Sequence, residues 1–331
     1  MVKANYIRRA FVTMSMIAFW ALCGMASAQT TTTPTVSEFL NAANSVYLID
    51  ATPSGMTNFT QGGQAVILND VADGAIASVF VTAEHQVIIA FQGTTGGLNM
   101  LLDPVAALTQ TAADVEIVIS DDYTGKPPAA FTASLKFARQ VVSLAEAQGY
   151  TVSNIFITGH SLGGIEAEYV ASQTGLGGIA FESTGIADSP ASGATGANFV
   201  NTVTYGDPVG EFGSDIDAMQ PNCPPYVAGG GKAPHYGWIL FMGKSSDQTT
   251  LRNEIEGNTI LNFASDVDFM ALLMEFHLPG VQAHDLGVTL NPNSSIVDGI
   301  GDMSGPVLKY EDMQIPALLN EAASAGHLIK G

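Results

Sequence analysis

A serine stands between two glycines at residues 159–164, whose sequence is Gly-His-Ser-Leu-Gly-Gly. An apolar run at 155–158 that can form a buried strand precedes this segment, and a helix-compatible run at 165–171 follows it. Strand, tight turn and helix in this order predict a nucleophile elbow, the sharp turn that presents a serine at the carboxyl edge of a sheet. The glycines fit such a turn because a Cβ at either position would collide with neighbouring backbone. We therefore expect Ser161 to be a nucleophile.

Apolar runs and amphipathic segments alternate along the rest of the chain. This alternation predicts an α/β fold with a mostly parallel central sheet flanked by helices. With 331 residues and 47% hydrophobic content, the chain can bury the core of one large domain. Strands are expected at 77–82, 87–91, 115–120, 178–183, 199–205 and 238–242, and helices at 36–47 and 129–148.

The N-terminus has the pattern of a secretory signal peptide. Basic residues come first, an apolar run follows at 11–25, and Ala-Ser-Ala at 26–28 forms a cleavage site. We therefore predict a signal peptide at 1–28, a polar tether at 29–35 and a single catalytic domain at 36–331. The mature protein is expected to be secreted or periplasmic. No transmembrane segment is expected after cleavage, because no later run reaches the roughly 18 apolar residues that a span requires.

The net charge bears on which partners the chain can bind, and the number of cysteines bears on whether it can form a disulfide. The formal net charge is −20 at pH 7, which makes nucleic acid an improbable partner and disfavours attraction to an anionic membrane. The chain has 2 cysteines, Cys23 and Cys223, and the first leaves with the signal peptide. No intramolecular disulfide is therefore expected in the mature chain.

A nucleophilic serine needs a base that takes its proton and an acid that orients the base. In α/β-hydrolases the chain order is serine, acid, histidine. Asp207 is the candidate acid, since it stands just past the strand expected at 199–205, where the chain enters a loop.

Several histidines follow Asp207 and are candidates for the base. His277 comes after a helix-like run at 266–276 and begins a His-Leu-Pro-Gly sequence that we expect to be a loop. We favour His277, and His284, seven residues later, remains the alternative. His235 is expected to pack at the start of a strand, and His327 lies in the C-terminal tail.

Over about residues 75–290 the chain resembles the class 3 lipases, a family with the α/β-hydrolase fold. The resemblance rests on Val-Ile-Ile-Ala-Phe-Gln-Gly-Thr at 87–94, on the segment 155–164 and on Asp-Pro-Val at 207–209. The family usually has arginine at the position of Gln92, so an ion pair made there would be absent from this chain.

The resemblance also implies the groups that bind the oxyanion. By position in the motifs these are Thr94 and Leu162, whose amides would stabilise a tetrahedral intermediate. The glycine-hinged apolar segment at 96–108 stands where the family has its lid, and an ordinary buried helix is an equal alternative. No cofactor or metal is expected, and Asp215 and Asp217 alone do not predict a calcium site.

Together these features predict a secreted serine ester hydrolase of lipase type. The expected substrates are triacylglycerols or related long-chain esters, met at an oil–water interface and cleaved through an acyl-enzyme. One alternative is a short-chain carboxylesterase or polyester depolymerase. An alternative of another class is a catalytically silent binding protein with a hydrolase fold, because fold does not determine function.

Overall fold

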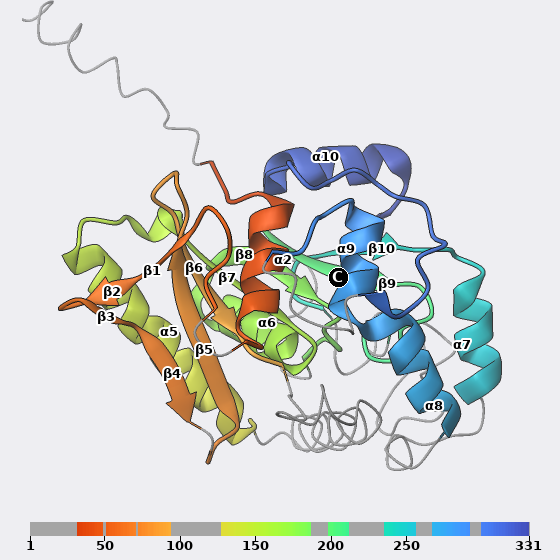
Figure 1. Ribbon diagram of the computed structural model, residues 1–331, viewed down its shortest axis with the longest axis horizontal. Coiled ribbons are helices and arrows are strands. Elements are labelled where there is room, and N and C mark those ends of the chain that lie inside the picture. Colours follow the sequence, from red (N-terminus) through yellow and green to blue (C-terminus); the bar gives the residue numbers. More distant parts are fainter. Residues whose placement is uncertain are drawn as a thin grey trace, which may run out of the picture. The chain divides into compact units, whose positions relative to one another are not determined.

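A computed structural model describes the following parts of the chain: residues 32–48, 51–70, 72–93, 127–186, 198–211, 235–255, 267–291 and 299–330. The chain divides into two units, Met1–Thr32 and Thr33–Gly331, and the second contains the fold described below (Figure 1). The predicted signal peptide at 1–28, the strand at 115–120 and the candidate lid at 96–108 lie outside the described residues.

A mostly parallel sheet forms the centre of the unit Thr33–Gly331. Strands β6 (Val87–Phe91) to β10 (Trp238–Met242) run parallel to one another, and the outer strands pair antiparallel. The predicted α/β class is therefore confirmed. The described strands of the sheet follow the order β1 (Thr57–Asn58), β5 (Ala75–Val81), β6, β7 (Ile155–His160), β8 (Gly177–Phe181), β9 (Phe199–Thr204), β10 and β11 (Leu328–Lys330), with β4 (Ile67–Asp70) also paired to β5.

The N-terminal part of the domain forms two hairpins. β5 and β6, which correspond to the strands expected at 77–82 and 87–91, form an antiparallel hairpin with Val81 opposite Val87. A separate pair, β2 (Thr60–Gln61) and β3 (Gln64–Ala65), forms a small exposed ribbon. The turn between β5 and β6 is polar and includes His85, whose φ is 59°.

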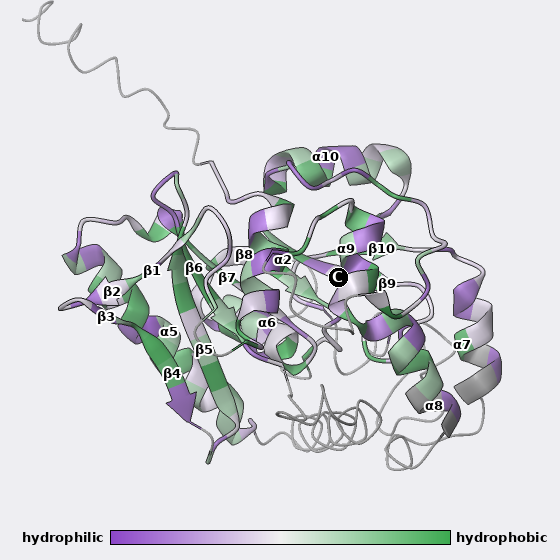
Figure 2. Cartoon of the chain, in the orientation of Figure 1, coloured by the Kyte–Doolittle hydropathy of each residue, from purple (hydrophilic) through white to green (hydrophobic). Residues whose placement is uncertain are grey.

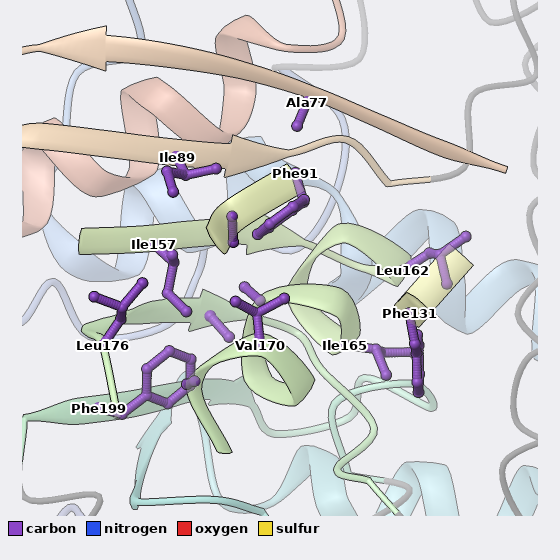
Figure 3. Close-up of a cluster of buried hydrophobic side chains, with 14 of the residues drawn as sticks. Ala77, Ile89, Phe91, Phe131, Ile157, Leu162, Ile165, Val170, Leu176 and Phe199 are labelled. Atoms are coloured by element: carbon purple, nitrogen blue, oxygen red, sulfur yellow. The ribbon is translucent and has the colours of Figure 1, made fainter. Parts of the chain in front are cut away.

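Helices cover both faces of the sheet, because successive residues of each parallel strand point to opposite sides. Ile89 of β6 packs with α5 (Ala129–Ala147) and α6 (Leu162–Thr174), whereas Ile88 packs with α2 (Val36–Ser45) on the other face. Figure 3 shows part of the first cluster, in which side chains of the central strands meet those of α6. Strands buried on both faces explain the nearly continuous apolar runs in the sequence.

Helix α2 begins at a capping box. The Glu38 backbone N–H donates to the Thr35 hydroxyl at 3.2 Å, and the Thr35 N–H donates to the Glu38 carboxylate at 2.8 Å. Thr33 is buried, and its hydroxyl accepts a hydrogen bond from the Ile315 N–H at 2.8 Å. The predicted tether at 29–35 is thus wrong at its C-terminal end, because Thr33 to Thr35 belong to the folded domain.

The C-terminal part of the domain is mainly helical. Helix α10 (Ile315–Ala325) carries both hydrophilic and hydrophobic residues (Figure 2), and it buries Ile315, Leu318 and Ala322. Among the described helices, none is long and apolar enough to cross a membrane. The remaining elements are η1 (Val152–Asn154), α7 (Asp247–Ile255), α8 (Val267–Leu272), the π-helical turn η4 (Leu273–His277) and α9 (Pro279–Leu286).

The loop predicted at 277–280 is wrong, because the chain enters α9 at Pro279. Leu278 is extended, with φ −72° and ψ 144°, and the following proline takes the first helical position. Proline is compatible with that position, where its missing N–H has no intrahelical partner to lose. A single extended residue therefore separates His277 from the next helix.

Candidate functional site

Ser161 occupies the sharp turn between β7 and α6. Its φ is 58° and its ψ is −129°, a conformation that is unfavourable for a residue with a Cβ. Two backbone hydrogen bonds hold the turn: the Ser161 N–H donates to the Phe181 carbonyl at 2.9 Å, and the Ile165 N–H donates to the Ser161 carbonyl at 3.1 Å. The strained residue is therefore fixed by the strand on one side and the helix on the other.

The glycines around Ser161 allow backbone to approach backbone. A Cβ on Gly159 would lie 2.1 Å from the Gly163 carbonyl oxygen, and one on Gly163 would lie 2.3 Å from the Phe91 carbonyl oxygen. A Cβ on Gly164 would lie 2.9 Å from the Phe181 carbonyl oxygen. The predicted collisions at 159 and 163 are confirmed, and they explain why the turn requires glycine on both sides of the serine.

Asp207 and His277 form a buried pair beside this turn. Asp207 follows the end of β9, and its Oδ2 lies 2.8 Å from Nδ1 of His277. Its Oδ1 accepts a hydrogen bond from the Val209 N–H at 3.0 Å. Burial alone would raise the pKa of Asp207, but the His277 imidazole, a side-chain hydrogen bond with Glu182 and the Val209 N–H together hold that pKa below its ordinary value. Asp207 is therefore an anion that accepts a hydrogen bond from the Nδ1–H of His277.

His277 is the last residue of the π-helical turn η4. Single π-helical turns widen a helix locally and occur frequently at functional sites. Its Nε2 and the Ser161 hydroxyl are both buried, and neither has a hydrogen-bond partner in the described part of the chain. The two groups thus do not bond to each other in this structure. Hydrogen bonds between catalytic groups are often long or misaligned without substrate.

His160 connects the turn to the His277 segment. Its Nε2 lies 2.7 Å from the His277 carbonyl oxygen, and the two rings have centroids 4.8 Å apart. Because a carbonyl can only accept, Nε2 carries the proton and Nδ1 is an acceptor. The Tyr47 hydroxyl lies 3.0 Å from that Nδ1. Burial lowers the pKa of His160 to about 3, so its imidazole is neutral in neutral solution.

The other histidines lie in different environments. His284 sits in α9, where its Nδ1 pairs with Oδ1 of the adjacent Asp285 at 3.0 Å rather than with Asp207. His235 precedes β10, and its Nδ1 lies 3.2 Å from the Glu168 carboxylate in a fully buried pair. Of the histidines considered from the sequence, the structure thus brings His277 to Asp207.

Of the two predicted oxyanion donors, Leu162 and Thr94, the structure describes only Leu162. Leu162 is the first residue of α6, where backbone N–H groups have no intrahelical acceptor and the helix dipole favours negative charge. Thr94 lies outside the described residues. Its neighbour Gly93 lies against the turn, since a Cβ there would stand 3.2 Å from the Ser161 Cβ and 2.5 Å from the His160 carbonyl oxygen.

Several groups near the turn, most of them buried, were not predicted from the sequence. Tyr47 is one of them, because a tyrosine just past the end of α2 has no pattern that assigns it to a site 113 residues away. Glu166 and Glu168 are fully buried in α6, and Glu182 is fully buried after β8. A signal for the two helical glutamates was present: apart from them and Tyr169, the helix from Leu162 to Ala171 has only small or apolar residues, which indicates burial, and buried carboxyls need partners.

Those partners are visible in the structure. The Ser134 hydroxyl donates to Glu166 at 2.6 Å, and Glu168 accepts from the Ser183 hydroxyl and the Tyr236 N–H. Among the described residues, no group of three or more histidine, cysteine or acidic side chains is arranged to hold a metal ion.

No protein-family model matches this chain, and no curated protein matches it in sequence.

Proposed function

We propose that the chain is a serine ester hydrolase of the α/β-hydrolase fold, with Ser161 as nucleophile, His277 as base and Asp207 as the orienting acid. The single observation that carries this proposal is the buried Asp207–His277 hydrogen bond of 2.8 Å beside a strained serine turn. The order serine, aspartate, histidine along the chain supports it further, because this order is typical of the fold.

The proposed reaction follows from these positions. Ser161 attacks the ester carbonyl carbon while its hydroxyl proton moves to Nε2 of His277. The same Nε2 then donates that proton to the leaving alcohol, and an acyl-enzyme remains on Ser161. A water molecule, deprotonated by Nε2, releases the carboxylic acid and restores the serine. Asp207 stabilises the imidazolium that forms in each step.

Backbone amides complete the proposed mechanism. The N–H of Leu162 is the first donor to the developing oxyanion, and the N–H of Thr94 is the second by resemblance to the class 3 lipases. Loss of one such donor costs about 2.7–4 kcal/mol of transition-state stabilisation in a comparable enzyme. The position of Gly93 against Ser161 supports the assignment of the second donor to the residue after it.

Lipase activity is the form of this function that we favour. Ser161 is only 2% exposed, so an ester can reach it only after its surroundings open. A covered nucleophile fits an enzyme that opens at an oil–water interface, where apolar surface is stabilised. A short-chain carboxylesterase or polyester depolymerase is the second candidate, and a silent hydrolase-fold binding protein is the third.

Export belongs to the same proposal, because a lipase that acts on external lipid must leave the cell. Cleavage after Ala28 gives a mature protein that begins at Gln29. N-terminal sequencing of protein from the medium or periplasm tests this directly. Recovery of chains with an intact Met1 from the membrane fraction would contradict it.

Hydrolysis of a chain-length series of p-nitrophenyl esters separates the three candidates. Ser161→Ala is expected to lose about a thousandfold or more in rate without loss of folding. Ser45→Ala is the matched control, because Ser45 is also buried and its hydroxyl also has no partner among the described residues. A preference for long acyl chains supports a lipase, and a preference for acetate or butyrate supports the esterase. Wild-type turnover no faster than that of Ser161→Ala would point to the binding protein.

A further inference from the structure

Glu182 is a buried carboxyl in an unfavourable backbone conformation. It follows the last residue of β8 with a φ of 53°, and its side chain is fully buried. The strand predicted at 178–183 ends at Phe181 for this reason, since the positive φ turns the chain out of the sheet. The positive φ and the buried carboxyl both lower the stability of the fold, which suggests that the Glu182 side chain has a role in the site next to it.

The carboxyl group of Glu182 is held at the end of β9. Its Oε1 accepts hydrogen bonds from the Thr204 hydroxyl at 2.8 Å and from the Thr204 N–H at 3.1 Å. Its Oε2 and Oδ2 of Asp207 both lie next to Gly210, where a Cβ would stand 2.2 Å and 3.2 Å from them. The two carboxyl groups therefore lie together in one buried site, where a hydrogen bond between them accounts for part of the pKa shift of each.

Two carboxyl groups in such a contact share a proton. Two carboxylates cannot both be ionised at hydrogen-bond distance in a buried site, because neither can donate and their charges repel. Asp207 also receives the His277 imidazole and the Val209 N–H, which stabilise its negative charge. Glu182 receives only neutral donors from Thr204. The proton therefore resides on Glu182.

We propose that Glu182 is a neutral carboxylic acid that donates a hydrogen bond to Asp207 and so positions that carboxylate for His277. The proposal rests on the function proposed above, in which the Asp207–His277 pair activates Ser161. It extends that set of groups by one positioning residue, which touches neither substrate nor the reacting atoms. Burial, followed by the charge of Asp207, raises the pKa of Glu182 well above its ordinary value, in agreement with this protonation state.

The hydrogen bond has a specific effect on the proposed base. A carboxylate that accepts from Glu182, Val209 and His277 has its charge and orientation fixed from three sides. Without the Glu182 donor, Asp207 can rotate about its side-chain bonds and its alignment with Nδ1 of His277 is lost. The step that suffers is proton transfer from Ser161, whereas substrate binding is not affected.

Two substitutions at Glu182 separate positioning from packing. Glu182→Gln keeps an acceptor for Thr204 and an N–H donor for Asp207, whereas Glu182→Met keeps the volume and removes the donor. Glu166→Met is the matched control, because Glu166 is equally buried and bonds Ser134 instead of Asp207. Thermal unfolding of each variant shows how much folding is lost at either position.

We expect kcat to fall only in the variant that removes the hydrogen-bond donor at position 182. Glu182→Met should lower kcat by about 10- to 100-fold with KM little changed, by analogy with outer partners of metal ligands. Glu182→Gln should remain close to wild type, and Glu166→Met should keep its kcat at temperatures where it is folded. Equal kcat in folded Glu182→Met and wild type, or equal losses in the Gln and Met variants, would overturn the proposal.

A second measurement does not depend on catalysis. The Nδ1 proton of His277, held between imidazole and carboxylate, is expected to give a low-field proton NMR signal, which His277→Ala identifies by its disappearance. Glu182→Met should shift or broaden this signal, while Glu182→Gln and Glu166→Met leave it in place. If wild type hydrolyses no ester but the signal responds in this way, the proposed function fails and the Glu182 contact stands. If esters are hydrolysed and the signal does not respond, the Glu182 proposal alone fails.

Discussion

The side chain of His160 bonds the backbone of His277: Nε2 of the former lies 2.7 Å from the carbonyl oxygen of the latter. The residue before the proposed nucleophile therefore fixes the segment that carries the proposed base. Tyr47 lies on the opposite side of the ring, 3.0 Å from Nδ1. The imidazole is uncharged in neutral solution, because burial lowers its pKa to about 3, and its Nε2 donates to the carbonyl.

The first prediction concerns acid stability. The pKa of His160 is lowered by burial from an ordinary 6.5 to about 3, so the unfolded chain binds this proton at a higher pH than the folded protein. Neutral His160 makes its full contribution to the free energy of unfolding above pH 6.5, and this contribution is lost as the pH falls toward 3. The limiting slope for one such group is about 1.36 kcal/mol per pH unit. His160→Gln, which keeps a donor and an acceptor, should show a shallower decline.

Urea unfolding at several acidic pH values measures this slope. His85→Gln is the control, because His85 lies exposed in the turn between β5 and β6. A wild-type slope equal to that of His160→Gln across the window would contradict a buried neutral imidazole.

The second prediction identifies the base. His277→Ala should be as damaging to ester hydrolysis as Ser161→Ala, and the double variant should be no worse, because the two groups act as one unit. His284→Ala should lose much less, since His284 pairs with Asp285 and is partly exposed. Steady-state rates on one p-nitrophenyl ester decide between them. A loss confined to His284→Ala would transfer the role of base to α9 and leave the serine assignment intact.

The third prediction concerns stability at higher pH. Burial raises the pKa of Glu166 well above 4.5, and the hydrogen bond from Ser134 opposes this only in part. The folded protein therefore holds a proton that the unfolded chain releases, and the free energy of unfolding falls as the pH rises above about 4.5. Glu166→Gln should reduce this decline. Glu182 has a shift of the same direction, so the decline should not vanish.

Unfolding of wild type and Glu166→Gln at pH values between mildly acidic and mildly alkaline gives the comparison. Glu146→Gln serves as control, since Glu146 is exposed on α5. Parallel curves for wild type and Glu166→Gln would show that Glu166 is ionised in the folded protein.

The fourth prediction concerns the close backbone contacts of the serine turn. Gly159→Ala would place a Cβ 2.1 Å from the Gly163 carbonyl oxygen, and neither backbone can move without displacing β7 or α6. A loss of about 1–3 kcal/mol in the free energy of unfolding, or more, is expected. Gly299→Ala is the control because a Cβ there meets nothing within 4 Å and the φ is ordinary. Equal stability of the two variants in thermal unfolding would contradict the contact.

The parts of the fold that the sequence predicted are those governed by local pattern. The strands at 87–91 and 238–242 were expected with the observed bounds, because continuous apolar runs between turns are typical of strands buried on both faces. Helix α5 was expected to within one residue, since Pro128 directly precedes its amphipathic run. The end of β8 was missed, because glutamate with a positive φ is too rare for propensity to anticipate.

Only part of the candidate site could be predicted from the sequence, because some of its residues meet only through the tertiary fold. Ser161 and Asp207 each stand at a recognisable strand end, so their placement at one edge of the sheet followed from topology. The choice between His277 and His284 required the three-dimensional course of the chain, because the two lie seven residues apart and only the structure shows that His277 meets Asp207. Tyr47 and Glu182 reach the site through tertiary contacts, and no spacing in the sequence reports such contacts.

The described strands from β5 to β11 lie in the sheet in the same order as in the chain. A chain that emerges N-terminus first can therefore add each strand beside the one before it, without inserting a late strand between two early ones. His277 follows the last parallel strand, so the Asp207–His277 pair is the final part of the site to assemble. A chain interrupted before η4 would lack the proposed base, and the proposed activity would stay off until synthesis or translocation had passed residue 277.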